Sequence, residues 1–123
     1  MDVLKPLNLV GDPNVPAVYL SGGNQQKMLI ARLLMQSPML LLLNQPTKGI
    51  DIGAKAEIHN LIRRLATNHD ITVLVNCSEE EELLYLCDRI VVFKHGMTES
   101  TTYRAADLGD AELRKLALDE VAQ

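Results

Sequence analysis

The 123-residue chain has 12 Lys and Arg against 16 Asp and Glu, a formal net charge of −4, and 3% aromatic residues. This acidic, aromatic-poor composition argues against a protein that binds a nucleic-acid backbone. The length predicts one domain. No apolar run approaches the ~20 residues of a membrane span, and the N-terminus lacks a signal-peptide pattern. We therefore expect a cytoplasmic protein with no metal site, since Cys77 and Cys87 have no ligand spacing and are expected to be idle thiols.

The hydrophobic pattern predicts helices alternating with strands. After an irregular lead-in at 1–19 we expect helices over 23–36, 52–67 and 79–87, the last of them short, and a final helix from 110 onward. Strands are expected over 39–43, 71–75, 90–93 and 98–104. The first helix has apolar residues spread around it and is expected to be well buried. The first two strands are continuously apolar, which predicts burial on both faces in a parallel sheet. The order predicts an α/β fold built from βαβ units.

The segment LSGGNQQK, residues 20–27, stands at the start of the first helix. A Ser and two glycines at a helix N-terminus can present N–H groups and a hydroxyl to an anion, although Ser-Gly-Gly is also an ordinary turn. PTKGIDIGAKAEIHNLIRRLA and LLYLCDRIVVFKHG follow at 46–66 and 83–96. In this order and spacing the motifs resemble the nucleotide-binding domain of ABC transporters, most nearly the second ATP-binding cassette of ribose-, xylose- and galactose-type importers. The resemblance covers residues 20–97, and 98–123, an edge strand and C-terminal helix, fit more loosely.

The resemblance implies roles for five of these residues. Ser21, Gly22 and Gly23 would contact the γ-phosphate of an ATP molecule held by a partner cassette in a head-to-tail dimer. Asn24 takes the place of the signature Gln, as is usual in the sugar subgroup. Asp51 would be the D-loop aspartate, which reaches across the same interface. The cofactors implied are ATP and Mg²⁺.

The segment LLLLNQPT departs from the family pattern, which has Asp-Glu in place of Asn44 and Gln45. In the family the aspartate orients Mg²⁺ through water and the glutamate polarises the attacking water. An amide is a poor Mg²⁺ partner and a negligible general base, so the Walker B motif is degenerate. The alternative is that the two amides simply cap the end of a strand. Ser78 falls at the switch-histidine position, where many sugar cassettes also have Ser.

A Walker A loop, G-x-x-x-x-G-K-[ST], occurs nowhere in the sequence. We therefore expect no ATP hydrolysis and no tight MgATP binding by this chain alone. The resemblance then implies a partial P-loop NTPase sheet without the P-loop strand, with a slot between strands 71–75 and 90–93. Unpaired hydrophobic strand edges promote aggregation. Three ways of filling the slot stay open: direct approach of the third strand, insertion of the Pro-rich N-terminal segment, or a strand from a second copy, which favours a dimer.

Two functions are compatible with the sequence. The chain could be part of a sugar-transporter ATPase whose signature completes an ATP site in trans on another ABC ATP-binding domain, or on a second copy of itself. Alternatively, it is a non-catalytic interaction or regulatory protein derived from an ABC ATPase. The first function implies that the chain contacts a permease at the inner face of the membrane. The sugar cannot be read from the sequence.

Overall fold

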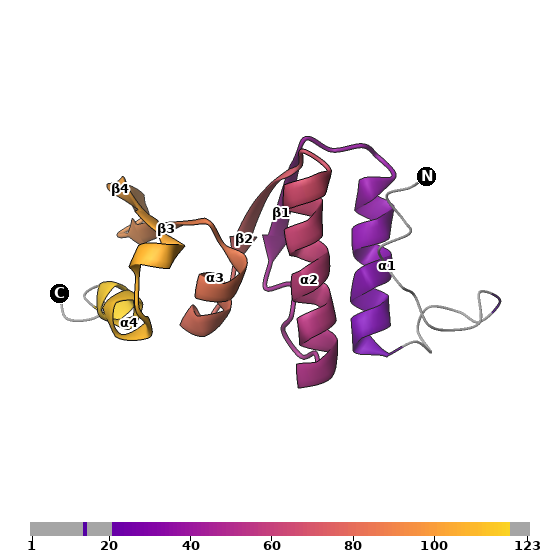
Figure 1. The fold of residues 1–123 in the computed structure, drawn as a ribbon, viewed down its shortest axis with the longest axis horizontal. Coiled ribbons are helices and arrows are strands. Elements are labelled where there is room, and N and C mark those ends of the chain that lie inside the picture. The colour runs from indigo at the N-terminus through magenta and orange to yellow at the C-terminus, as the bar shows by residue number, and fades with distance from the viewer. Residues whose placement is uncertain (1–13, 15–20, 119–123) are drawn as a thin grey trace. The chain divides into compact units, whose positions relative to one another are not determined.

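The computed structural model describes residue 14 and residues 21–118 (Figure 1). The elements are α1 (Gly22–Leu34), β1 (Leu40–Asn44), α2 (Ile52–Asn68), β2 (Thr72–Asn76), α3 (Glu80–Leu86), β3 (Arg89–Lys94), β4 (Met97–Arg104), the 3-10 helix η3 (Ala105–Asp107) and α4 (Asp110–Leu118). The predicted helices and strands are all present, with bounds shifted by at most two residues. The predicted lead-in at 1–19 lies, apart from Asn14, outside the described residues.

The chain divides into two compact units, Met1–Asn76 and Cys77–Gln123, where the length predicted one domain. The boundary falls inside the 20–97 segment that carries the family resemblance. In the first unit β1 and β2 pair in parallel, from Leu40 opposite Thr72 to Asn44 opposite Asn76. The α/β class and the parallel pairing of the first two strands are thus confirmed.

The third strand does not continue this sheet. Within residues 21–118, β3 pairs antiparallel with β4 in a separate two-stranded sheet and does not pair with β2, so direct closure of the expected slot by the third strand is not seen. The turn between these strands explains the outcome. His95 and Gly96 have φ values of 51° and 77° and join Lys94 to its partner Met97. A two-residue turn with both residues at positive φ matches the twist of antiparallel strands, so β3 pairs with its nearest neighbour along the chain.

The first unit is built around one face of α2. The buried residues of α2 recur at helical spacing. Buried side chains of α1, of β1 and of the residue directly before β2 complete the core: Ile58, Leu61, Ile62, Leu65, Ile30, Leu34, Leu41, Leu43 and Ile71. α2 contacts both α1 and β2, and α1 and α2 run side by side in Figure 1.

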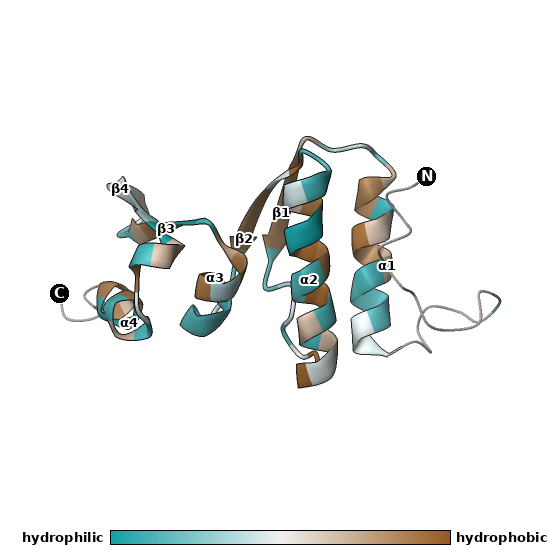
Figure 2. Cartoon of the chain, in the orientation of Figure 1, coloured by the Kyte–Doolittle hydropathy of each residue, from teal (hydrophilic) through white to brown (hydrophobic). Residues whose placement is uncertain are grey.

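The sheet of the first unit is buried on one face, not two. Burial alternates along β1, so that Leu41 and Leu43 are buried while Leu40 and Leu42 are 53% and 64% exposed. Leu74 on β2 is also exposed. Figure 2 shows the apolar colouring of both strands. The continuous apolar runs predicted that both strands are buried on both faces. That prediction is wrong for this second face, because no element among the described residues covers it.

Helix α1 likewise exposes part of its apolar surface. Its buried residues are Gly23, Lys27, Ile30 and Leu34. The prediction of a well-buried helix is therefore wrong, since four large apolar side chains in or directly after it are at least 40% exposed: Met28, Leu29, Leu33 and Met35.

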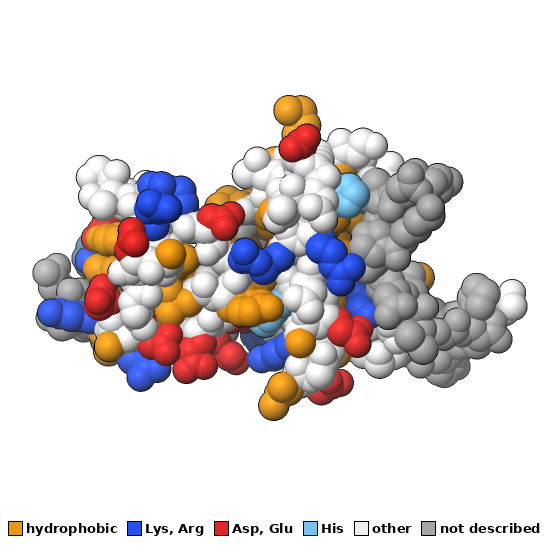
Figure 3. All heavy atoms as spheres, in the orientation of Figure 1, with side chains coloured by type: hydrophobic (Ala, Val, Ile, Leu, Met, Phe, Trp, Pro, Cys, Tyr) orange, Lys and Arg blue, Asp and Glu red, His pale blue; other side chains and the backbone are white. Residues whose placement is uncertain are grey.

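The second unit has its own small core. Ile90, Ala105 and Leu113 are buried together, and partly buried apolar side chains of α3 and its flanks pack against them. Acidic residues occupy the first turn of α3, favourable against the helix dipole, and Figure 3 shows acidic side chains gathered over this helix. Cys77 is buried, and burial, followed by the charge of Glu82, raises its pKa to about 12. Neither cysteine forms a disulfide, and the Cys77 thiol stays protonated at neutral pH.

Replacing Gly96 with Ala should destabilise the β3–β4 hairpin. The backbone there has a φ of 77°, while a Cβ would meet no described atom within 4 Å, so the cost is conformational and about 1–2 kcal/mol. Gly96→Asn is the matched control, because Asn tolerates this conformation better than Ala. Hydrogen exchange of the β3 and β4 amides measures the effect. Equal protection in the two variants would contradict the conformational explanation.

Candidate functional site

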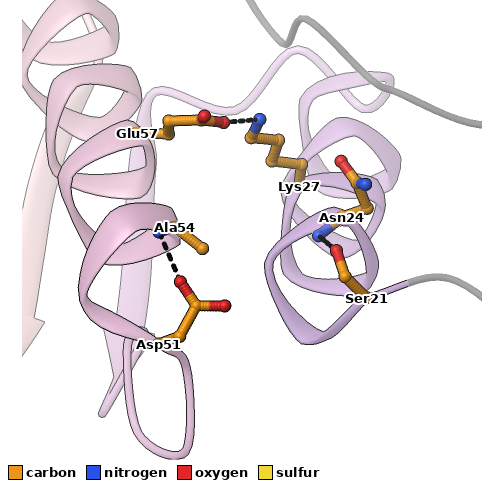
Figure 4. Close-up of polar contacts among 6 residues, drawn as sticks. All are labelled: Ser21, Asn24, Lys27, Asp51, Ala54 and Glu57. Atoms are coloured by element: carbon orange, nitrogen blue, oxygen red, sulfur yellow. Dashed lines mark hydrogen bonds and ion pairs between the residues drawn. The ribbon is translucent and has the colours of Figure 1, made fainter.

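Helix α1 begins at Ser21, which acts as its N-cap. The Ser21 backbone is extended, with ψ of 157°, and its Oγ accepts a hydrogen bond of 3.3 Å from the backbone N–H of Asn24 (Figure 4). The Ser21 carbonyl accepts the first helical bond, from the Gln25 N–H. Ser is among the preferred N-cap residues because its oxygen satisfies a donor that the helix leaves unpaired. Ser21 is exposed, so this end of α1 faces solvent.

The two glycines of the segment LSGGNQQK have different structural roles. A Cβ on Gly23 would lie 2.7 Å from the Ala54 Cβ, closer than real Cβ contacts allow. Gly23 is therefore required for the close approach of α1 to α2. A Cβ on Gly22 would meet no described atom within 4 Å, and Gly22 is exposed. Packing among the described residues thus explains Gly23 and leaves Gly22 unexplained.

Helix α2 begins in the same way at Asp51. Its Oδ1 accepts a 2.9 Å hydrogen bond from the Ala54 N–H, and its carbonyl accepts from the Lys55 N–H. The preceding turn passes through Gly49 at a φ of 77°, which delivers Asp51 to the cap position. Asp51 is exposed, like Ser21.

The N-termini of α1 and α2 lie at the same end of the helix pair. Gly23 meets Ala54 within the first turn of each helix, and one turn further on the Lys27 ammonium pairs with the Glu57 carboxylate (Figure 4). The two helix dipoles therefore point the same way. Neither helix has an acidic residue in its first turn, but the Asp51 carboxylate caps α2, so the partial positive charge that remains available to an anion is that of the α1 end.

The two amides that end β1 are engaged with the end of β2. The Asn44 Oδ1 accepts a 2.9 Å hydrogen bond from Asn76 Nδ2, and the Gln45 backbone N–H donates to the Asn76 carbonyl at 2.7 Å. Gln45 has a φ of 51°, in the left-handed region. Asn76 was not singled out from the sequence, and its signal is its position at the carboxyl end of the neighbouring parallel strand.

These residues do not fit a Mg²⁺ site of this chain's own. Magnesium prefers carboxylate oxygens, whereas the oxygen of Asn44 already accepts from another amide. Over residues 21–118 no three Asp, Glu, His or Cys side chains are grouped so that they could hold a metal ion. Ser78 is exposed and belongs to the second unit.

A shallow groove of about 440 Å³ lies in the first unit between α1 and β1. Its apolar lining includes Leu29 and Leu33 from α1 and Leu42 from β1, with Gln26, Arg32 and Gln36 at the α1 side. The groove therefore joins the exposed faces of the helix and the sheet into one apolar surface.

None of the helices in the described part of the chain has the length and apolar character that crossing a bilayer requires.

Comparison with solved structures defines the class of this fold. The ATP-binding cassette MJ1267 of an ABC transporter matches with a TM-score of 0.74 and 25% identity, over 98% of this chain and 46% of the cassette. The dimeric cassette MJ0796 bound to ADP and Pi matches with a TM-score of 0.63 and 28% identity, over 85% of this chain and 44% of that one. The chain therefore has the fold of part of an ABC ATPase cassette.

Curated relatives narrow the class further, although no protein-family model matches. Ribose import ATP-binding protein RbsA 2 of Mesorhizobium japonicum is 47% identical over 127 residues, which cover 99% of this chain and 25% of that protein. The RbsA 2 protein of Rhizobium meliloti is 49% identical over 87 residues, 71% of this chain and 17% of that protein. Over most of its length the chain is thus homologous to ATP-binding proteins of ribose- and galactose-type importers. It spans about a quarter or less of their length.

Substituting Ala at the two signature glycines should have opposite effects on stability. Gly23→Ala forces the new methyl against Ala54 and should cost about 1–3 kcal/mol of unfolding free energy. Gly22→Ala meets no obstacle and should be neutral or stabilising by up to ~1 kcal/mol, because Ala favours a helix. Urea unfolding followed by far-UV circular dichroism measures both. Adding Ala54→Gly should relieve Gly23→Ala, and failure of this rescue would contradict the contact.

Proposed function

We propose that this chain supplies the signature-bearing side of a composite ATP site, whose phosphates are held by the P-loop of a partner ABC ATPase domain in a sugar importer. The observation that carries the proposal is the exposed N-terminus of α1, capped by Ser21 and left open at Gly22. The homology to ribose import ATP-binding proteins and the likeness to a dimeric cassette that binds ADP and Pi support it. The chain would act in the cytoplasm and would be held at the membrane by contact with a permease.

The chemistry of the proposed site divides between the two partners. The Ser21 oxygen accepts the cap bond from Asn24, so its O–H can donate to a phosphate oxygen. Without a Cβ, Gly22 allows a phosphate to approach the backbone and the positive helix end. Asp51 caps α2 at the same end and would contact the partner. The partner would hold Mg²⁺ and activate water, because Asn44 and Gln45 offer neither a carboxylate nor a base.

The open apolar surface suggests how the chain meets the rest of a cassette. The exposed face of β1 and β2, with Leu40, Leu42 and Leu74, continues into the groove at Leu29 and Leu33. Exposed apolar patches of this kind mark interaction surfaces. Because the chain matches less than half of MJ1267, we propose that the P-loop part of a cassette covers this surface. A purely interacting, non-catalytic role would use the same surface.

Trans-completion of the ATP site can be tested with an intact homologous cassette, diluted until it hydrolyses ATP slowly. Adding this chain should raise the rate, while the chain alone should show no turnover. Gly22→Ala should reduce the stimulation about tenfold or more, because the methyl group keeps the phosphate from the helix end. Phosphate release measures the rate.

The matched control for this assay is Gly109→Ala, which adds the same methyl group in the second unit without a described neighbour within 4 Å. It should stimulate like the unaltered chain. Turnover by the chain alone, or full stimulation by Gly22→Ala, would contradict the proposal. Binding without any effect on the rate would favour the non-catalytic alternative.

Docking of the P-loop part can be tested by replacing Leu42 with Glu. A charge in the centre of the exposed face should weaken binding to a separately produced P-loop part of a homologous cassette by about tenfold or more, because burying it is costly. Ala66→Glu, at an exposed position on α2, is the control and should bind normally. Calorimetric titration gives the affinities. Equal binding by both variants would exclude this surface as the docking site.

A further inference from the structure

We propose that Lys27 and Glu57 are positioning residues, whose ion pair sets the register of α1 against α2 and so places Ser21 and Gly22 relative to Asp51. The inference rests on the proposed function for its consequence, but its structural part concerns this chain alone. The last residue of LSGGNQQK would then act through the neighbouring helix and not by contacting a ligand.

The seam between the two helices has successive levels. Nearest the N-termini, Gly23 lies against Ala54, and the Lys27–Glu57 pair follows (Figure 4). Spacings of four residues on α1 and three on α2 place both levels on one face of each helix. Ile30 and Ile58, the next buried apolar residues after the pair on the two helices, belong to the core of the unit. The ion pair is therefore a polar contact between the two helices one turn behind their exposed ends.

The two members of the pair have unequal environments. The Lys27 side chain is 5% exposed, whereas the Glu57 side chain is 59% exposed. An ion pair with one well-solvated member contributes little to stability, and burying an ammonium group is costly. Gain in stability is thus a poor explanation for a lysine at this position, where an apolar side chain would pack with less cost.

A contact that fixes geometry is a better explanation. At the Gly23–Ala54 level a hydrogen atom faces a methyl group, so little resists sliding or rotation of one helix along the other. Apolar packing behind the pair is non-directional. A buried ammonium group that loses its carboxylate is costly, so the Lys27–Glu57 pair disfavours registers other than the one observed. Since Ser21 lies six residues before Lys27 and Asp51 six before Glu57, that register fixes the two caps against each other.

The test uses Lys27→Met, which keeps the packing volume and removes the charge without leaving a buried ammonium unpaired. Arg64→Met, at an exposed position on α2, is the control, and Lys27→Arg should restore the pairing. Spin labels at Arg32→Cys and Ala56→Cys, in a chain with Cys77→Ala and Cys87→Ser, report the distance between α1 and α2. In the ATPase assay, the chain is titrated against the intact cassette. The titration gives two separate quantities: the maximal stimulation of the ATPase rate, and the chain concentration at which half of that stimulation is reached.

We expect Lys27→Met to broaden the distance distribution and to lower the maximal stimulation about tenfold, with little change in the half-maximal concentration. A variant that merely folds less well would instead need a higher concentration and reach the same maximum. An unchanged distribution with full maximal stimulation would overturn the inference. If the unaltered chain gives no stimulation, the proposed function fails, and the distance distribution alone decides whether the pair positions the helices.

Discussion

The close approach of α1 to α2 is the constraint on which the first unit depends. It requires a residue without a side chain at position 23, because any Cβ there would collide with Ala54. Once the helices meet at that point, their N-terminal caps, Ser21 and Asp51, are brought to the same end. The α2 end carries the Asp51 carboxylate, whereas the α1 end has the neutral Ser21 cap, so the uncompensated partial positive charge is that of α1.

The same unit presents core-like surface to solvent. Leucines alternate along β1 so that one set packs within the unit and the other set stays exposed. A sheet that is apolar on both faces needs a layer on each side, and the described residues supply one layer. The chain matches less than half of a solved cassette, and in the proposed function the P-loop part of a cassette would supply the second layer. The proposed ATP site and the proposed docking surface would then both belong to the first unit.

The amides at the end of β1 fit this interpretation. Asn44 and Asn76 occupy paired positions at the carboxyl ends of adjacent parallel strands, and they bond to each other. A carboxamide both donates and accepts, so two of them can satisfy each other without a cation. Two carboxylates in the same places would repel each other. The hydrogen bond between Asn76 and Asn44 thus satisfies both amides without a metal ion.

The sequence by itself determined where the helices and strands lie, to within two residues, and the site residues that it suggested stay predictions. Apolar periodicity located the helices and strands, and local chemistry located the helix starts, because Ser21 and Asp51 cap helices through contacts within three residues. Tertiary structure decided what depends on distant partners: the pairing of β3 with β4, the exposure of Leu42, the different roles of Gly22 and Gly23, and the Lys27–Glu57 pair. The physical reason is that propensity and capping act within a few residues, whereas burial and pairing depend on which surfaces meet in the folded chain.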